Sequence, residues 1–235
     1  MSNSKIVETI QVTRDFGESG VVTRALRGVN MVLKSGEFAA MAGPSGSGKT
    51  TLLNIIGGLD RPTSGSVLVE GHDLTRLSGS ELSRLRRDRI GFIFQTYNLI
   101  PILTAYENAE YVLMLQGLPR QERRERVMHV LKEVGLDGLE NRFPRELSGG
   151  QQQRVAIARA IVPEPALVLA DEPTANVDSE TGSALLDLML RLNEEKGATF
   201  LFSTHDRAVM RRARRLIRLR DGLIIEDSAC CPAEA

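Results

Sequence analysis

Apolar positions along the chain follow two patterns. Between residues 5 and 42, Ile6, Ile10 and Val12 alternate with the opposite face, which predicts half-buried strands. Later apolar runs are short, and several are apolar on both faces, as expected for core strands of a parallel sheet. These later runs lie at 38–42, 66–70, 90–94, 166–170 and 198–202. Helical stretches alternate with them, so the order indicates an α/β sheet.

A helical segment interrupts this order. From about residue 98 to 163, the period predicts helices at 104–116, 120–134 and 150–162, with no convincing strand among them. We interpret this segment as a helical subdomain inserted into a single domain of residues 5–227. A helix at 179–196 and strands near 215–219 and 223–226 complete that domain, and residues 228–235 are expected to be a flexible tail.

Composition restricts the classes of partner. The chain has 235 residues, with 30 Lys plus Arg and 30 Asp plus Glu, so it lacks the basic excess of a nucleic-acid binder. No apolar run reaches 18 residues and no signal peptide begins the sequence, so we expect a cytosolic protein. The only cysteines, Cys230 and Cys231, are adjacent near the end, which suits neither a disulfide nor a metal site. Two arginine clusters, at 84–89 and 211–215, are expected to be solvated helix faces.

One segment matches the phosphate-binding P-loop, G-x-x-x-x-G-K-[ST], between a predicted strand and a predicted helix. It consists of Gly43, Pro44, Ser45, Gly46, Ser47, Gly48, Lys49 and Thr50. Lys49 would reach the β- and γ-phosphates, Thr50 would offer its hydroxyl to Mg²⁺, and Thr51 could reach the α-phosphate side. The alternative is a glycine-rich turn without a ligand. The surrounding order favours a nucleoside triphosphate site.

Two carboxylates follow the apolar run 167–170. Asp171 and Glu172 stand at the carboxyl end of this strand, where ligands of α/β sheets bind. Asp171 would contribute to the Mg²⁺ shell, and Glu172 would polarise a water for in-line attack on the γ-phosphate. The alternative is an acidic turn before Pro173, which the upstream P-loop disfavours.

A second candidate phosphate-binding helix start occurs upstream of these carboxylates. Ser148 is a natural N-cap, and the glycines after it allow close approach of an anion. The segment reads Leu147-Ser148-Gly149-Gly150-Gln151. By itself it would be an ordinary capped helix.

This segment, between a P-loop and a Walker B strand, resembles the signature of ABC transporter ATP-binding subunits. The resemblance implies a P-loop NTPase core with a parallel-rich sheet, an N-terminal antiparallel β subdomain and the helical subdomain. It also implies that ATP with Mg²⁺ is bound and hydrolysed between two head-to-tail copies. In that arrangement Ser148, Gly149, Gly150 and Gln151 of one copy would cap the γ-phosphate held by the other.

The same resemblance implies roles for four further residues. Gln95 would touch Mg²⁺ or the attacking water, and His205 would contact the γ-phosphate and support Glu172. Asp178 would link the two active sites, although Ala175 and Val177 stand where many relatives have Gly and Leu. Phe16 would stack on adenine, where the family usually has tyrosine. Gln95 could instead be a surface amide, and Phe16 could be a core residue.

A narrower resemblance concerns the partner. Segments 57–65, 92–95 and 98–108 resemble the ATPases of lipoprotein-releasing and macrolide-exporter systems. This implies a separate integral membrane subunit that contacts residues 96–108, a location on the cytoplasmic face of the membrane, and export or lipid release. The alternative is a soluble ABC ATPase that acts as a clamp on nucleic acid or ribosomes. Such proteins usually carry two cassettes or a long coiled coil, and this sequence has neither.

Overall fold

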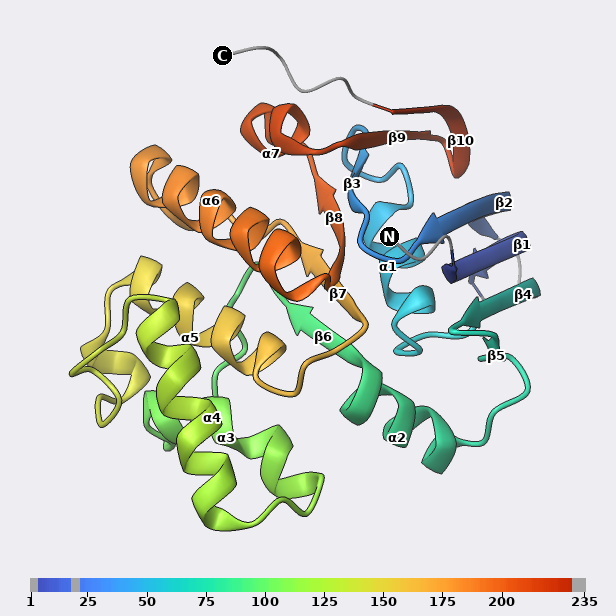
Figure 1. Cartoon of the computed structure of the whole chain (residues 1–235). Helices are drawn as coiled ribbons and strands as arrows, with labels where there is room; N and C mark the ends of the chain where they lie inside the picture. The colour runs from blue at the N-terminus through green and yellow to red at the C-terminus, as the bar shows by residue number, and fades with distance from the viewer. Residues whose placement is uncertain (1–3, 18–21, 230–235) are drawn as a thin grey trace.

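Two sheets and a set of helices make up the fold (Figure 1). The computed structural model describes residues 4–17 and 22–229. The larger sheet has six strands in the order β10-β9-β3-β8-β7-β6, and all of them except β10 run parallel. Its strands are β3 (Phe38–Ala42), β6 (Ile90–Ile93), β7 (Leu167–Asp171), β8 (Thr199–Thr204), β9 (Arg215–Arg220) and β10 (Leu223–Ala229).

A smaller antiparallel sheet lies beside the larger one, in the order β2-β1-β4-β5. Its strands are β1 (Lys5–Phe16), β2 (Thr23–Lys34), β4 (Ser64–Val69) and β5 (His72–Asp73). This arrangement matches the N-terminal antiparallel β subdomain expected from the sequence. In β1, Val7 and Val12 are buried but Ile10 is 45% exposed, so the predicted alternation of Ile6, Ile10 and Val12 does not hold. The reason is a register shift of β1 between Thr9 and Val12.

Helices cover both faces of the larger sheet. They are α1 (Lys49–Ile56), α2 (Gly79–Arg89), α3 (Ala105–Leu115), α4 (Arg120–Glu133), α5 (Gly149–Ile161), α6 (Ser179–Lys196) and α7 (Arg207–Arg212), with a 3-10 turn at Pro144–Glu146. Between β6 and β7 the chain forms only α3, α4, α5 and that turn, at one end of the molecule (Figure 1). These helices agree with the predicted ones to within one residue at each end.

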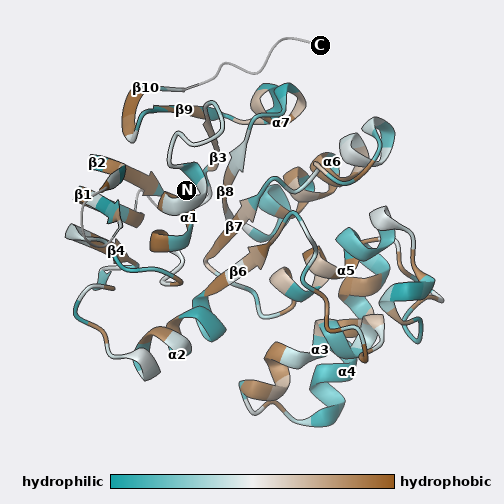
Figure 2. Cartoon of the chain, turned by 180° about the vertical axis from the view of Figure 1, so that it is seen from behind, coloured by the Kyte–Doolittle hydropathy of each residue, from teal (hydrophilic) through white to brown (hydrophobic). Residues whose placement is uncertain are grey.

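Side chains of β3 separate the core into two parts. Phe38 belongs to a cluster with the inner faces of α5 and α6, and Met41 belongs to a cluster with α1 and the antiparallel sheet. The ring of Phe38 packs against Phe202 of β8, with centroids 4.7 Å apart. Because β3 is buried on both faces, its entire length is apolar. Figure 2 shows the same apolar character along β6 and β7.

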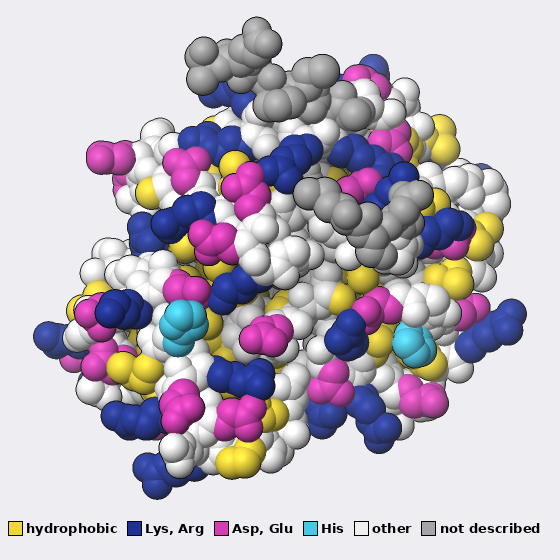
Figure 3. Space-filling view, viewed as in Figure 1, with side chains coloured by type: hydrophobic (Ala, Val, Ile, Leu, Met, Phe, Trp, Pro, Cys, Tyr) yellow, Lys and Arg dark blue, Asp and Glu magenta, His cyan; other side chains and the backbone are white. Residues whose placement is uncertain are grey.

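Two regions differ from the predicted organisation. Strand β10 continues to Ala229, so residues 228 and 229 belong to a strand and not to a tail, and residues 230–235 with both cysteines lie outside the described part. Arg215, expected on a solvated helix face, lies in β9 and pairs with Glu37 and Asp227 at 2.7 Å each. Arg211 and Arg212 do lie on a helix, in the last turn of the short α7. Basic and acidic side chains are interspersed on the face seen in Figure 3.

Candidate active site

The carboxyl ends of four parallel strands meet at one edge of the larger sheet. The P-loop follows β3, Gln95 follows β6, Glu172 follows β7, and His205 follows β8. Because neighbouring parallel strands end at the same edge, residues far apart in the sequence come together there. A pocket of about 590 Å³ lies at this edge. It is lined by Ala25, Ser45, Gly46, Ser47, Gly48, Lys49, Thr50, Thr51, Gln95, Glu172 and His205.

Two positions of the P-loop must be glycine because the backbone of a neighbouring strand lies too close to leave room for a side chain. A Cβ on Gly48, whose φ is +100°, would lie 2.5 Å from the carbonyl oxygen of Ala25. A Cβ on Gly43 would lie 2.1 Å from the carbonyl oxygen of Leu219. Both distances are below any tolerable contact, so β2 and β9 hold the loop tightly from outside. The loop is thereby preorganised around the pocket.

The start of α1 is suited to an anion. Its N-cap residue, Gly48, has no side chain to accept from the first-turn N–H groups, and no acidic residue stands in that turn. Lys49 is buried, and its Nζ donates to the carbonyl oxygens of Gly43 at 2.8 Å and Pro44 at 3.0 Å. The ammonium therefore lies inside the concavity of the loop, beside the position where phosphate oxygens would be cradled.

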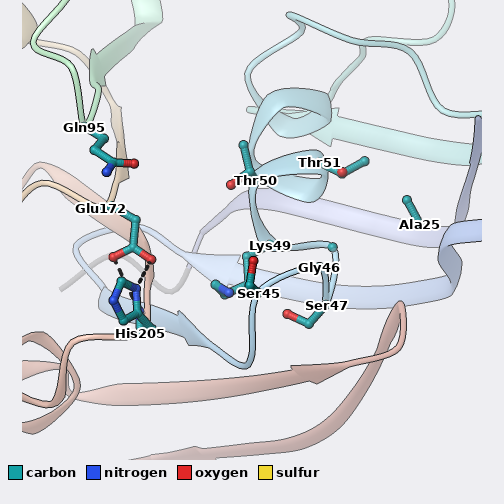
Figure 4. A pocket seen from close by; sticks show the side chains of 11 residues that line it. Ala25, Ser45, Gly46, Ser47, Lys49, Thr50, Thr51, Gln95, Glu172 and His205 are labelled. Carbon is teal, nitrogen blue, oxygen red and sulfur yellow. Dashed lines mark hydrogen bonds and ion pairs between the residues drawn. The ribbon is translucent and has the colours of Figure 1, made fainter. Parts of the chain in front are cut away.

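Thr50 and Asp171 come together as the sequence predicts. The hydroxyl of Thr50 donates to Oδ1 of Asp171 at 3.2 Å across the gap between α1 and β7. Gln95 lines the pocket on the side of Glu172, and its amide is directed toward Thr50 (Figure 4). A hydroxyl, a carboxylate and an amide oxygen form a hard oxygen set that fits Mg²⁺, which keeps several waters and binds phosphates in addition.

Glu172 faces the segment that follows β8. Its Oε1 lies 2.6 Å from Nδ1 of His205, and its Oε2 accepts from the hydroxyl of Thr204 at 3.2 Å and from the backbone N–H of His205 at 3.4 Å (Figure 4). The φ of Glu172 is +47°, in the left-handed region that non-glycine residues rarely adopt. Such strain is concentrated at functional sites, where surrounding contacts hold the residue in place.

Sequence reasoning missed two contributors to this site. Ala25, on β2, lines the pocket, and its methyl side chain carries no signal of such a role. Thr204 carries a stronger signal, because its hydroxyl directly precedes the predicted His205 at the end of a buried strand. Its contact with Glu172 became evident only with the fold.

The signature segment does not line the pocket. Ser148 caps α5: its Oγ accepts from the backbone N–H of Gln151 at 3.3 Å, and Oε1 of Gln151 accepts from the N–H of Ser148 at 2.9 Å. A Cβ on Gly149 would lie 2.9 Å from the Tyr97 hydroxyl, and one on Gly150 would lie 2.5 Å from Cγ2 of Thr181. The glycines are therefore required by packing within the chain, in addition to the anion approach expected from the sequence.

Phe16 and Asp178 also lie outside the pocket lining. Phe16 is 43% exposed at the end of β1, so it is not the core residue that the sequence left open. The Asp178 carboxylate is the N-cap of α6 and accepts from the N–H groups of Glu180 at 3.1 Å and Thr181 at 2.9 Å. These hydrogen bonds, the Thr181 backbone N–H first, lower the pKa of Asp178.

Fold and pocket together define a P-loop nucleoside triphosphatase. The ABC transporter family matches residues 26–175, more than half of the sequence. The chain belongs to the ABC transporter family, and it is an ATP-binding subunit with ATPase activity. Within the described ranges, no helix combines the length and apolar character needed to cross a bilayer.

Two sequence relatives illustrate the range of similar proteins. The ABC transporter ATP-binding protein MJ0796 of Methanocaldococcus jannaschii is 46% identical over 92% of this chain and 94% of its own length. The macrolide export ATP-binding/permease protein MacB of Escherichia coli is 44% identical over 97% of this chain. The chain spans only 35% of that MacB protein.

Solved structures agree with this placement. A dimeric structure of a post-hydrolysis state of the ATP-binding cassette MJ0796 bound to ADP and Pi has a TM-score of 0.88 at 45% identity, covering 95% of this chain and 98% of that one. The structure of cbiO1 from Clostridium perfringens, part of the ABC transporter complex cbiONQ, has a TM-score of 0.86 at 30% identity, covering 96% and 88%. The predicted ABC ATPase fold is thus confirmed.

Proposed function

We propose that this chain is the ATPase of an export-type ABC transporter, that two copies enclose two ATP molecules, and that a separate membrane subunit receives the resulting motion. The main support for a site shared between two copies is the set of residues that line the pocket. It contains the P-loop, Gln95, Glu172 and His205, whereas Ser148 at the start of α5 does not contribute to its lining. A second copy in head-to-tail orientation would supply Ser148, Gly149, Gly150 and Gln151. The dimeric form described for MJ0796 supports this arrangement.

Each ATP would bind with its phosphates in the P-loop. Backbone N–H groups of residues 45–50 would donate to the β-phosphate oxygens at the positive end of α1. Lys49 would exchange its loop carbonyl acceptors for β- and γ-phosphate oxygens, and Thr51 would reach the α-phosphate side. Thr50, Asp171 and Gln95 would hold Mg²⁺, which when bound neutralises charge on the transferring phosphoryl group.

Glu172 would act as the general base. Its carboxylate would accept a proton from a water as the water oxygen bonds to the γ-phosphorus and the bond from phosphorus to the bridging oxygen breaks, releasing ADP and phosphate. His205 and Thr204 contact the Glu172 carboxylate directly and would keep it oriented toward that water. His205 would contact the γ-phosphate through the remaining edge of its ring.

Adenine would stack on Phe16. The guanidinium of Arg14 lies over the Phe16 ring, 4.4 Å from its centroid, and is held by two hydrogen bonds of 2.9 Å to the Asp60 carboxylate. Since the Arg14 cation covers one face of the ring, the base would stack on the other face. A tyrosine hydroxyl is not required for such stacking.

The membrane subunit would dock on a groove beside the predicted contact segment 96–108. A cavity of about 280 Å³ lies between α2, β6, α3 and the end of α5. It is lined by Leu59, Arg86, Arg87, Ile90, Gly91, Phe92, Phe94, Val112, Arg159, Ala160 and Pro163. Outside this lining, Ile102 is 81% exposed, and Met114 and Leu115 of α3, the helix that contributes Val112 to the lining, are also exposed. An apolar surface with a basic rim suits an amphipathic segment of a partner.

The membrane partner and the direction of transport rest on similarity to MacB. The name of that protein joins ATP-binding and permease functions in one chain, of which this chain matches about a third. We propose an integral membrane transporter subunit as the partner, and we propose that residues 5–227 form a single ATPase domain with a helical subdomain at 98–163. The domain would lie on the cytoplasmic face of the membrane through this partner.

Complementation between two inactive variants tests the composite site. Lys49→Ala removes the P-loop cation and Ser148→Arg blocks the signature, and each variant alone should lack turnover. In an equal mixture, half of the dimers pair one copy of each variant and contain one intact site of two. The mixture should therefore recover about a quarter of the wild-type rate. No recovery, despite exchange of subunits seen by mass measurement, would overturn the shared site.

Purification with membranes tests the partner. The tagged chain should co-purify with an integral membrane protein, and replacing Ile102 and Leu115 with Asp should abolish this while leaving the basal ATPase rate unchanged. Recovery of ribosomes or DNA instead would favour the clamp function.

A further inference from the structure

Two hydrogen bonds connect the segment after β6 with the loop after β7. Nδ2 of Asn176 donates to the backbone carbonyl oxygen of Gln95 at 2.8 Å. The hydroxyl of Tyr97 donates to the backbone carbonyl oxygen of Asn176 at 3.1 Å. The two bonds run in opposite directions between the same two segments and close a ring, which we call the Asn176–Tyr97 clamp. Since Gln95 and Asn176 are far apart in the sequence, the clamp fixes one loop against the other.

The segment on one side of the clamp has an unusual backbone. Tyr97 and Asn98 have φ angles of +59° and +49°, so two successive non-glycine residues are left-handed. Arg159 of α5 stabilises this turn, because its Nη2 donates to the Tyr97 carbonyl oxygen at 2.8 Å and its Nη1 donates to that of Asn98. Burial lowers the pKa of this guanidinium, and the two carbonyl acceptors offset its desolvation.

The loop on the other side of the clamp is attached to two further elements. The Thr174 hydroxyl donates to Oδ2 of Asp206 at 3.0 Å, immediately after His205. Nε2 of Gln153, a buried residue of α5, donates to the carbonyl oxygen of Pro173 at 2.8 Å. The loop that leads away from Glu172 is therefore held by α5 and by the segment containing His205, and the clamp adds Gln95 to this group.

The start of α5 also contacts the clamp. The Tyr97 hydroxyl lies so close to Gly149 that a Cβ there would be 2.9 Å from it. A side chain at position 149 would press on this hydroxyl, which is the donor of the bond to Asn176. The clamp is thus located where the segments containing Gln95, Gly149 and Asn176 meet.

We propose that Asn176 and Tyr97 are positioning residues for Gln95. Neither residue lines the pocket, whereas Asn176 binds the backbone carbonyl oxygen of Gln95, whose side-chain amide is directed into the pocket (Figure 4). With its carbonyl held, Gln95 is fixed relative to Glu172, which lies beside it after the neighbouring strand (Figure 4). Without the clamp, the backbone of 95–98 can move and the amide loses its alignment. This inference rests on the proposed function, in which Gln95 acts on the metal or the attacking water.

The test is a set of single and double variants of the purified chain, assayed for ATPase activity, ATP affinity and thermal stability. Asn176→Ala and Tyr97→Phe should each lower kcat by about ten- to a hundredfold, as expected when a reacting group is displaced by about 1 Å. The ATP dissociation constant, measured in the Glu172→Gln background, should change less than about twofold, because the phosphate-binding loop is untouched. The midpoint of thermal unfolding should be nearly unchanged.

Double variants test whether the clamp affects kcat through Gln95. If the clamp acts through Gln95, then adding Asn176→Ala to Gln95→Ala should lower kcat no further than Gln95→Ala alone. Tyr106→Phe is the matched control, because it also removes a tyrosine hydroxyl bond, to Glu110 at 3.1 Å, but on α3. Its kcat should equal that of the unmodified chain.

Three results separate the possible failures. Wild-type kcat in both clamp variants, with Gln95→Ala impaired, would overturn the clamp and leave the proposed function intact. A multiplicative loss in the double variant, or parallel losses of ATP affinity and thermal stability, would show that Asn176 acts elsewhere and would also overturn it. Normal turnover in Gln95→Ala would instead overturn the role of Gln95, on which the proposal rests.

Discussion

The carboxylate of Glu172 is bound to His205 through both of its oxygens, one to the ring at 2.6 Å and the other to the backbone N–H at 3.4 Å. Glu172 directly follows β7 and His205 directly follows β8, and the parallel pairing of Asp171 with Ser203 brings the two strand ends together. The geometry fits a base whose carboxylate is oriented by its neighbour.

Glu172→Gln should separate ATP binding from hydrolysis. The amide keeps the size of the side chain but accepts no proton, so kcat should fall by about a thousandfold. ATP should still bind, and the variant should accumulate as a dimer in light scattering with ATP and Mg²⁺. Glu125→Gln, on the exposed face of α4, is the control. A monomer with an unchanged rate would contradict the mechanism.

Lys49→Ala should abolish ATP binding. The variant loses the cation inside the loop and its bonds to Gly43 and Pro44, so both charge and loop geometry are affected. Titration with a fluorescent ATP analogue measures the effect, and circular dichroism reports whether the fold persists. Lys34→Ala, an exposed lysine of β2, should bind normally. Normal turnover in the Lys49 variant would refute the P-loop assignment.

Phe16→Ala and Arg14→Ala should weaken the binding of ATP by about tenfold each, since a base stacked on an aromatic ring contributes about 1–3 kcal/mol. Inorganic triphosphate, which has no base, provides the control within each variant, and its affinity should not change. Phe16→Tyr should keep the ring and bind as well as the parent. Equal losses for ATP and triphosphate would indicate a general disturbance of the site rather than stacking.

Asp178→Ala should lower the unfolding midpoint by about 2–4 °C at pH 7 by removing the α6 cap. The Thr181 N–H lowers the folded-state pKa of Asp178, so its stabilisation is present above the ordinary Asp pKa of about 3.9. It is lost as the pH falls through the lower folded value. The difference between the two proteins should therefore shrink in acid.

Asp178→Ser distinguishes the cap from the expected link between active sites. Serine caps helices well, so this variant should keep its stability. A fall in kcat in the serine variant would support the link, whereas a fully active serine variant would leave only the cap.

Arg215→Met should lower the free energy of unfolding by about 2 kcal/mol, below the 3–5 kcal/mol of a fully buried pair. Its hydrogen bond to Asp227, and next that to Glu37, raise the pKa of Arg215, which therefore stays charged throughout the accessible pH range. Urea denaturation measures the loss. Arg218→Met, which removes an exposed pair with Glu226 on the same strand, should cost less than about 1 kcal/mol.

The sequence predicted most of the site because its motifs are local. Lys49 and Thr50 are specified by fixed spacing within one loop, and Glu172 follows directly from a buried strand. The ion pairs of Arg215 were not predicted because its partners are distant in the sequence: Glu37 directly precedes β3, and Asp227 lies in β10. The clamp was equally invisible, since the bond from Asn176 to Gln95 depends on how β6 and β7 pair.

Phe16 was predicted only in part, because its residue type is visible in the sequence and its surroundings are not. Its aromatic character was evident from the sequence, but its exposure and the cation above its ring depend on Asp60, which lies beyond α1. The local sequence pattern predicts which residue types occur in each element and in what order. Which of them share a surface depends on strand pairing and on which face each strand buries.

The neighbours of β3 determine when the phosphate-binding loop can form during synthesis. Strand β3 lies between β8 and β9, and the carbonyl of Ser47 accepts from the N–H of Gly222 at 3.1 Å. During synthesis the loop is made early, but β8 and β9, which lie on either side of β3, are made only after most of the polypeptide. A nascent chain that stops short of β9 contains every motif but lacks the strand and the Gly222 hydrogen bond that hold this loop in shape.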